Sequence, residues 1–468
     1  MLEHLRLTSA AEEAGTAHDA QAPDVDRLEV EHMPEPDAED GLQVVEICAG
    51  AGGQSLGLHR AEFSHLLAVE LDHSAADTLR ANLPNGEYVV RVGDVADENV
   101  WNPKEYEGRV DLLAGGVPCP PFSIAGKQLG TKDERDLFAW AVQLCATVKP
   151  KALMLENVRG LSSNRFAAYR QHTLDRLRDI GYVPDWQLLH AKDFGVSQFR
   201  PRFVLVAVLE EYAPYFKWPE AQAHEPPTVG ELLRGLMGSN GWESENVEAW
   251  VKRACGIAPT IVGGSKKHGG ADLGPTRAKR AWAELGVDAM GIANEPPMAG
   301  WAPKGDAPGP KLTIDMVKRL QGWDNEKFSW DFKGRKTSVY RQIGNAFPPP
   351  VAKAVGEAIK SALMREGEPG KLIETTDVVL DPVYKLLHSH GRPLTVEQMI
   401  SKLAQRGIVM SQPTVERHLN HLSRDFELRT KERSSGAVAF SLGDFQGFIG
   451  QDDHRRHVLF AEQRSKIS

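Results

Sequence analysis

The sequence predicts an α/β protein built on a doubly wound, mostly parallel sheet, with an inserted region and a smaller C-terminal domain. From residue 41 to 209, short apolar segments alternate with amphipathic helical ones, which is the pattern of a parallel sheet covered on both faces. In addition, Glu70, Asp94 and Glu156 each close or follow one of the apolar segments. Ligands bind beyond the carboxyl ends of the strands in such sheets, so we expect these side chains at one site.

Seven strands and three intervening helices are expected in this region. The strands are predicted at residues 42–48, 66–71, 88–92, 110–114, 151–156, 183–190 and 203–209. The helices are predicted at residues 73–82, 136–148 and 164–180.

The rest of the chain divides into four further parts. Residues 1–40 are acidic, rich in Ala and Pro and poor in aromatic residues, which favours a disordered, solubilising tail. Residues 211–310 contain many Gly and Pro, and residues 311–365 return to ordered patterns that end in a helix. The first domain, 41–210, is therefore expected to resume after an insertion.

Residues 375–445 predict a winged-helix-like domain. Helices are expected at 382–390, 395–406 and 413–424, with Thr395 as an N-cap, followed by a hairpin of residues 426–433 and 437–442. The last helix of such domains often enters the DNA major groove. Its mildly positive charge leaves DNA contact and protein docking or packing equally open here.

The formal net charge of −9 is unevenly distributed. Residues 1–40 hold twelve acidic and two basic residues, so the remaining chain carries +1. Residues 251–281 hold seven Lys or Arg against one Asp. Because a local basic patch rather than the net charge meets phosphates, this segment is the candidate nucleic-acid surface.

Composition and cysteine positions exclude several classes of protein. The 468 residues, 41% hydrophobic and 25% charged, are typical of a globular protein of two or three domains. No apolar run approaches the roughly 20 residues that span a bilayer, and no secretory signal begins the sequence. Cys48, Cys119, Cys145 and Cys255 form no CxxC pair, which argues against zinc or disulfides and for a reducing cytoplasm.

One cysteine stands in a loop that fixes its direction. Residues 115–123, Gly-Gly-Val-Pro-Cys-Pro-Pro-Phe-Ser, hold Cys119 among three prolines directly after an apolar run. Proline fixes its own φ and restricts the residue before it. Taken alone, the segment is equally a structural turn and a loop that presents a thiol.

Further motifs accompany this loop. Residues 155–158, Leu-Glu-Asn-Val, end one strand, and residues 198–202, Gln-Phe-Arg-Pro-Arg, precede the last. Residues 46–53, Glu-Ile-Cys-Ala-Gly-Ala-Gly-Gly, open the first strand–helix turn, where glycines let a cofactor approach the backbone. Such a loop alone is compatible with NAD, FAD or S-adenosylmethionine. Glu70 could accept hydrogen bonds from ribose hydroxyls, and Asp94 could accept one from an adenine amino group. Taken singly, Glu70 is equally a solvated strand end and Asp94 equally a turn residue or helix cap.

Together these motifs resemble those of the DNA cytosine-5 methyltransferases. Their order and spacing match over residues 41–209 and 311–363, with the target-recognition region inserted between. The resemblance implies a Rossmann-like methyltransferase fold, S-adenosylmethionine as cofactor with S-adenosylhomocysteine as product, and no metal. By this resemblance Glu70 would bind the ribose, Asp94 the adenine, and Asn345 with its neighbours the methionine end of the cofactor. The cofactor contacts that it implies are Ile47, Cys48, Ala49, Gly50, Gly52, Gly53, Glu70, Leu71, Asp94, Val95, Pro118, Asn345 and Phe347.

The resemblance also implies a mechanism. Cytosine C5 is a poor nucleophile, so the Cys119 thiolate would first add to C6. Glu156, with its pKa raised, would act as the acid at N3. Arg202 would contact O2 and help to fix the cysteine loop, with Gln198 and Arg200 supporting that region. C5 would then take the methyl group, and loss of the C5 proton to water would expel Cys119.

Two positions depart from the family pattern. Cys48 stands where the family commonly has Phe against the adenine, and a polarisable Cys can still pack there. Pro120 stands where Gln commonly follows the nucleophile, which stiffens the loop and removes a backbone donor. We expect activity to persist with Pro120.

The expected partner is double-stranded DNA, from which the target cytosine must be flipped. A cognate restriction endonuclease acting on the same site is a further candidate partner, and the protein is expected to be monomeric on DNA in a bacterial cytoplasm. Trp323 matches a family motif that organises the recognition region, and we expect it to pack. Contacts to phosphates or bases are expected from Ser123, Lys266, Lys267, Arg277, Lys279 and Arg280.

Four alternatives share part of this pattern. A transfer-RNA cytosine-5 methyltransferase carries the same motifs, although the long basic insertion and the winged helix favour DNA. An exocyclic-amine methyltransferase would place Asn or an acidic residue where Cys119 stands. A nicotinamide dehydrogenase would not explain Cys119, Glu156 and Arg202 together. A non-catalytic DNA-binding regulator would keep its function in Cys119→Ser, whereas an enzyme would lose turnover.

Overall fold

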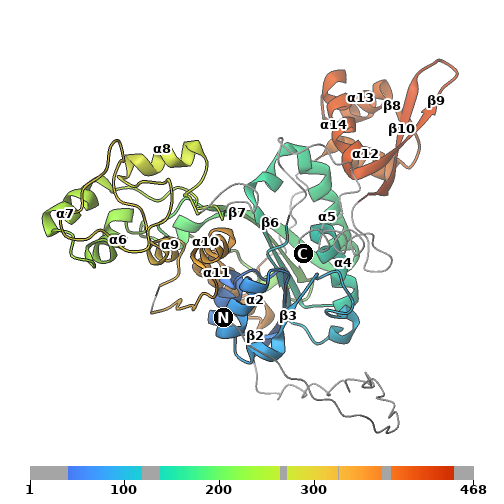
Figure 1. Cartoon of the computed structure of the whole chain (residues 1–468). Helices are drawn as coiled ribbons and strands as arrows, with labels where there is room; N and C mark the ends of the chain where they lie inside the picture. The colour runs from blue at the N-terminus through green and yellow to red at the C-terminus, as the bar shows by residue number, and fades with distance from the viewer. Residues whose placement is uncertain (1–40, 119–136, 264–270, 325, 371–380, 447–468) are drawn as a thin grey trace, which may run out of the picture. The chain divides into compact units, whose positions relative to one another are not determined.

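A computed structural model describes residues 41–118, 137–263, 271–324, 326–370 and 381–446 (Figure 1). The acidic segment 1–40 lies outside the described residues. Among the helices that are described, none is long and apolar enough to cross a membrane.

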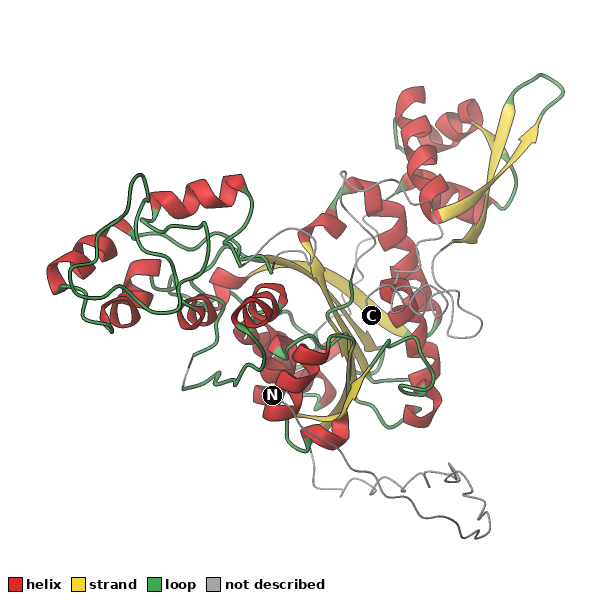
Figure 2. Cartoon of the chain, in the orientation of Figure 1, coloured by secondary structure: helices red, strands yellow, loops and turns green. Residues whose placement is uncertain are grey.

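A seven-stranded sheet forms the centre of the first domain (Figure 2). The spatial order is β3-β2-β1-β4-β5-β7-β6, and every neighbouring pair is parallel except those of β7, which runs antiparallel to both β5 and β6. The chain builds outward from β1 to one side and then returns to β4 on the other, so β1 and β4 flank the switch point where such sheets bind ligands. The strands are β1 Leu42–Ile47, β2 Phe63–Glu70, β3 Val90–Val92, β4 Leu112–Gly115, β5 Ala152–Val158, β6 Tyr182–His190 and β7 Pro201–Leu209.

Helices cover both faces because successive strand residues point in opposite directions. Val45 belongs to a buried cluster with residues of α4 and α5, whereas Val44 belongs to one with residues of α1 and α11. The sheet is therefore doubly wound, as predicted. The helices of this domain are α1 Gly53–Arg60, α2 His73–Asn82, α3 Gly86–Val89, α4 Leu137–Val148, α5 Ala167–Asp179 and α11 Pro349–Leu363.

Helix α11 brings a late segment of the chain back against the first helix. A Cβ atom on Gly57 of α1 would lie 2.4 Å from the Ala352 Cβ and 2.6 Å from the Pro349 carbonyl oxygen. The two helices can therefore approach this closely only because residue 57 has no side chain. This packing fixes residues 345–347, which precede α11, beside the start of α1.

The third strand is shorter than predicted. Residues 86–89 form the short helix α3, so β3 begins at Val90 rather than at Tyr88, which is 78% exposed. Asn85 adopts a left-handed conformation (φ 53°) that starts this turn. The prediction began the strand at Tyr88, whereas this residue belongs to α3 and is directed to solvent.

The inserted region is mainly helical and shares its core with later residues. One buried cluster contains Trp250 and Trp282 from the insertion together with Trp323 and Tyr340. Trp323 is 2% exposed and packs against Phe332 with ring centroids 5.1 Å apart, which agrees with a packing role. The helices here are α6 Val229–Gly238, α7 Ser244–Arg253, α8 Thr276–Glu284, α9 Ile314–Leu320 and α10 Lys336–Asn345.

The C-terminal part has the order of a winged helix, three helices followed by a hairpin. Thr395 is the N-cap of α13, where its side chain accepts from the Gln398 backbone N–H as part of a capping box. A short strand, β8, was not predicted and adds to the hairpin in the order β8-β10-β9. The elements are α12 Pro382–His390, β8 Leu394–Thr395, α13 Val396–Gln405, α14 Gln412–Asp425, β9 Phe426–Glu432 and β10 Val438–Phe445.

Candidate active site

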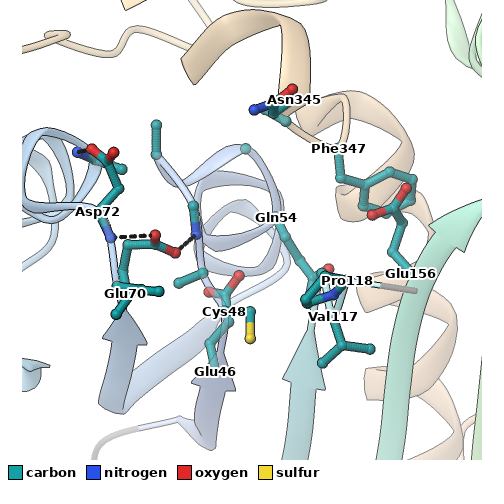
Figure 3. A pocket seen from close by; sticks show the side chains of 18 of the residues that line it. Glu46, Cys48, Gln54, Glu70, Asp72, Val117, Pro118, Glu156, Asn345 and Phe347 are labelled. Atoms are coloured by element: carbon teal, nitrogen blue, oxygen red, sulfur yellow. Dashed lines mark hydrogen bonds between the residues drawn. The ribbon is translucent and has the colours of Figure 1, made fainter. Parts of the chain in front are cut away.

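A cavity of about 680 Å³ lies at the carboxyl ends of the central strands (Figure 3). It collects residues from the carboxyl ends of β1 to β5, from the start of β7 and from the segment that precedes α11. The sequence-predicted residues that line it are Cys48, Ala49, Gly50, Gly53, Glu70, Leu71, Asp94, Val95, Pro118, Glu156, Arg202, Asn345 and Phe347.

At one end of the cavity, Glu70 closes β2 and joins two turns. Its Oε2 accepts a hydrogen bond from the Gly50 backbone N–H (2.7 Å), and its Oε1 accepts one from the Asp72 N–H (2.8 Å). Burial raises the pKa of Glu70, and these two hydrogen bonds act in the opposite direction. The carboxylate is thus held rigidly, with lone pairs that can still accept from hydroxyl groups.

Asp94 follows β3 at the same end of the cavity. Its Oδ1 accepts a hydrogen bond from the Ala96 backbone N–H (3.0 Å), as a turn residue would. Because Asp94 and Val95 also line the cavity, the turn places an acceptor where a ligand amino group could donate.

The glycine-rich loop depends on left-handed backbone conformations. Gly50 and Gly52 have φ of 59° and 92°, and Cys48 adopts a φ of 51° despite its side chain. A Cβ on Gly52 would lie 2.3 Å from the Trp330 ring, whose Nε1–H donates to the Ala51 carbonyl (2.7 Å). Gly52 therefore faces Trp330 and is not among the residues that line the cavity.

Ile47 is likewise not among the lining residues. It is fully buried in the cluster beneath the sheet, with α4 and α5. Ile47 therefore anchors the end of β1, directly before the glycine-rich loop, to the buried core.

The other end of the cavity holds a buried ion pair. Glu156 and Arg202 are each 8% exposed, and Arg202 Nε lies 2.5 Å from Glu156 Oε1. The antiparallel register of β5 and β7 sets Val158 opposite Arg202, so the two strand ends bring both side chains together. Burial raises the pKa of Glu156, and the positive charges of Arg202 and Arg200 oppose that shift.

Asn157 was not predicted as a site residue. Its Nδ2 donates to the Val117 carbonyl oxygen (3.2 Å), which ties the end of β5 to the segment that leads to Pro118. The signal in the sequence was its place directly after Glu156 at the strand end.

Gln198 and Arg200 occupy supporting positions and are not among the lining residues of the cavity. Gln198 accepts from the Ile261 N–H (2.9 Å) and donates to Gln321 Oε1 (2.6 Å). Arg200, 1% exposed, donates to the carbonyls of Ile261 (2.6 Å), Gly344 (2.7 Å) and Ala346 (2.8 Å). They hold the start of β7 to the inserted region and to the segment before α11.

The predicted nucleophile and several predicted DNA contacts fall outside the described residues. These are Cys119, Ser123, Lys266 and Lys267, together with the departure at Pro120. Pro118, the last residue described before this gap, lines the cavity.

Helix α8 carries the predicted DNA contacts that lie within the described residues. Arg277 and Arg280 are exposed, whereas Lys279 Nζ lies 2.8 Å from Asp272 Oδ2. The helix therefore presents two arginines to solvent and a third cation that is partly neutralised.

The cavity also contains polar side chains that sequence reasoning missed. Gln54, directly after the double glycine, is 3% exposed, and Arg341 and Gln342 of α10 line the same cavity. Glu46, near the end of β1, accepts from Ser55 Oγ (2.6 Å) and contacts His65 Nε2 (2.9 Å).

Sequence comparisons with known proteins agree on one family. Residues 42–361 match the model of the C-5 cytosine-specific DNA methylases. The type II methyltransferase M.NaeI of Lentzea aerocolonigenes is 60% identical over 427 residues, which are 91% of this chain and 99% of that protein. M.NgoMIV of Neisseria gonorrhoeae is 48% identical over 69% of this chain and 98% of its own length. The solved Dnmt2 methyltransferase of S. pombe aligns over 70% of this chain and 100% of its own, with 17% identity and a TM-score of 0.45.

Proposed function

This chain belongs to the C-5 cytosine-specific DNA methylase family and is a DNA cytosine-5 methyltransferase, and we propose that it methylates a cytosine in a specific duplex sequence. The target cytosine would be flipped out of the duplex. S-adenosylmethionine would supply the methyl group, and Cys119 would form a covalent bond to C6. The observation that carries the proposal is the buried Glu156–Arg202 pair at one end of the cavity, with the Glu70 carboxylate at the other.

The residues at the Glu70 end fit S-adenosylmethionine. Glu70 offers a fixed acceptor for two ribose hydroxyls, and Asp94 offers one for the adenine amino group. The loop from Cys48 to Gly50 lines the cavity with little side-chain bulk. When bound there, the cofactor supplies a methyl group on a positively charged sulfur.

Glu156 and Arg202 would act on the cytosine ring. We assign the thiolate of Cys119 as the group that bonds to C6, while Glu156 gives a proton to N3, so that electron density gathers at C5. Arg202 would donate to O2 and hold Glu156 in place through their ion pair. After C5 has been methylated, loss of its proton to water would re-form the C5–C6 double bond and break the C6–S bond, which releases the Cys119 thiolate. N3 would then return its proton to Glu156, which restores the neutral acid.

The protonation state that this step needs is favoured by the site. The pKa of Glu156 is raised by burial, so its neutral form persists to higher pH than in an exposed carboxyl. A neutral carboxyl can donate its proton, whereas a carboxylate only accepts.

Duplex DNA is the proposed partner of the basic surface. Arg277 and Arg280 on α8 are exposed, so both can contact phosphates or base edges.

We also propose that the protein acts as a monomer on DNA in a bacterial cytoplasm, beside a restriction endonuclease of the same specificity. We also propose that the chain divides into a catalytic domain, a target-recognition region, a return to the catalytic domain and a winged-helix-like domain. Their limits would be residues 41–210, 211–310, 311–365 and 375–445.

Base-resolution mapping of 5-methylcytosine tests the proposal. Plasmid DNA would be taken from cells that express the full chain and from cells that express Cys119→Ser. We expect one short sequence to be methylated with the intact chain alone. Equal methylation in both, or methylation scattered without a common sequence, would contradict it.

A further inference from the structure

Gln54 is a buried amide without an assigned role. It is the second residue of α1, is 3% exposed and lines the cavity. Neither its Oε1 nor its Nε2 has a hydrogen-bond partner among the described residues. A buried amide that lacks partners destabilises the folded protein, so an apolar residue would serve better if Gln54 only filled space.

The position of Gln54 indicates which part of a ligand it meets. Figure 3 shows its side chain between the Glu70 end and the Glu156 end of the cavity, on the side of Pro118. The first residue of α1, Gly53, fits closely against the Phe347 carbonyl, since a Cβ there would lie 2.2 Å from it. The start of α1 is therefore held against the segment that carries Asn345 and Phe347.

The amino-acid end of the proposed cofactor, which the family resemblance places at Asn345 and its neighbours, fits this location. With the ribose at Glu70 and the sulfur directed toward the cytosine site near Glu156, its amino-acid end must lie between or beside them. That end is a zwitterion, with an ammonium that donates and a carboxylate that accepts. A single amide side chain offers the matching acceptor and donor.

We propose that Gln54 binds the amino-acid end of S-adenosylmethionine, with Nε2–H donating to the carboxylate and Oε1 accepting from the ammonium. The inference rests on the proposed function, because it requires this cofactor in this cavity. Gln54 is then a binding residue that distinguishes the whole cofactor from its adenosine portion.

Titration calorimetry with two ligands tests the inference on the full chain. S-adenosylhomocysteine carries the amino-acid end, and 5′-methylthioadenosine has the same adenosine and sulfur without it. For Gln54→Met, we expect the affinity for S-adenosylhomocysteine to fall about tenfold to a hundredfold, as for lost hydrogen bonds to charged groups. The affinity for 5′-methylthioadenosine should stay within about twofold of the wild-type value.

Two controls accompany the titration. Glu70→Gln, at the ribose end, should weaken both ligands by the same factor. The melting temperature of unliganded Gln54→Met should equal or exceed that of the wild type, since an unpaired buried amide has been removed.

The outcomes separate the inference from the proposal on which it depends. If Gln54→Met weakens both ligands alike, or neither, the inference is wrong and the amide finds its partners within the chain. If the wild-type protein binds neither ligand, the proposed cofactor itself is wrong.

Discussion

At the scale of single residues, the proposed mechanism requires a carboxyl group, that of Glu156, to hold a proton. Burial raises the pKa of Glu156 while the charges of Arg202 and Arg200 lower it. The site thus balances two needs, because the arginine that orients the carboxyl also favours its ionised form. Burial is the larger effect, and it favours the acid.

Replacing this acid should slow turnover. We expect Glu156→Gln to lower kcat by roughly a hundredfold to ten-thousandfold, the usual contribution of a general acid, because an amide cannot give up a proton. Transfer of a labelled methyl group to DNA, with substrates at saturation, measures the change. Unchanged kcat would contradict the role of Glu156.

The pH dependence should identify the same group. Because the folded-state pKa is raised, the neutral acid present at low pH is lost as pH rises through that value. The wild-type rate should therefore fall on the alkaline side, and Glu156→Gln should lack that alkaline fall. A fall that persists unchanged in Glu156→Gln would assign the titration to another group.

Removing Arg202 should show how much an unpaired, buried Glu156 carboxylate destabilises the folded protein. Arg202→Met leaves Glu156 without its ion pair, and we expect a loss of about 3 to 5 kcal/mol in the free energy of unfolding at alkaline pH. The loss should shrink at lower pH, where Glu156 is neutral. Urea unfolding at several pH values measures this, and the double variant with Glu156→Gln should recover part of the stability. A loss independent of pH would contradict the buried ion pair.

At the scale of elements, the site was predictable where it depends on strand ends. Glu70, Asp94 and Glu156 each follow an apolar run, and the parallel arrangement brings their ends to one edge. The pattern could not show which way each loop residue faces. Ile47 packs in the buried cluster with α4 and α5, and Gly52 faces Trp330.

The sequence pattern could not predict hydrogen bonds between residues that lie far apart in the chain. Gln198 meets Gln321, 123 residues later, and Asn157 meets Val117, 40 residues earlier. Such contacts depend on how the insertion and the sheet pack, and no local spacing encodes them. Gln54 was missed because a polar residue in the first turn of a helix is ordinary on the surface, and only burial makes it notable.

The close approach of α1 and α11 gives a prediction for these elements. Gly57→Ala would place a methyl 2.4 Å from the Ala352 Cβ and 2.7 Å from the Lys353 backbone nitrogen, so the helices must separate. We expect a loss of about 1 to 3 kcal/mol in the free energy of unfolding. The control is Gly235→Ala in α6, which meets nothing within 4 Å and should stabilise by roughly 0.5 to 1 kcal/mol. Equal stability of the two variants in urea would show that the packing is looser than described.

At the scale of the whole molecule, the chain separates its charges. The first 40 residues carry nearly all of the net negative charge, and the rest of the chain is nearly neutral. Within that remainder, residues 251–281 form a basic segment. The net charge of −9 therefore says little about DNA binding, which depends on the local surface.

This separation predicts how DNA affinity responds to salt. If Arg277 meets a phosphate, Arg277→Gln should weaken binding to all duplexes alike and reduce the slope of log K against log salt by about one. Lys333→Gln is the control, since Lys333 is paired with Asp331 (2.5 Å) outside the insertion. If Arg277 meets a base instead, the loss should depend on sequence at one position and leave the slope unchanged.

The measurement that most directly tests the central claim is capture of the enzyme on DNA. A duplex of the mapped sequence would carry 5-fluorocytosine at the target, where fluorine at C5 cannot leave as a proton does, so the bond from Cys119 to C6 should persist. With S-adenosylmethionine added, we predict a complex that survives denaturing electrophoresis for the intact chain and is absent for Cys119→Ser. No stable complex with the intact chain on a duplex that it methylates, or an equal one with Cys119→Ser, would contradict the account.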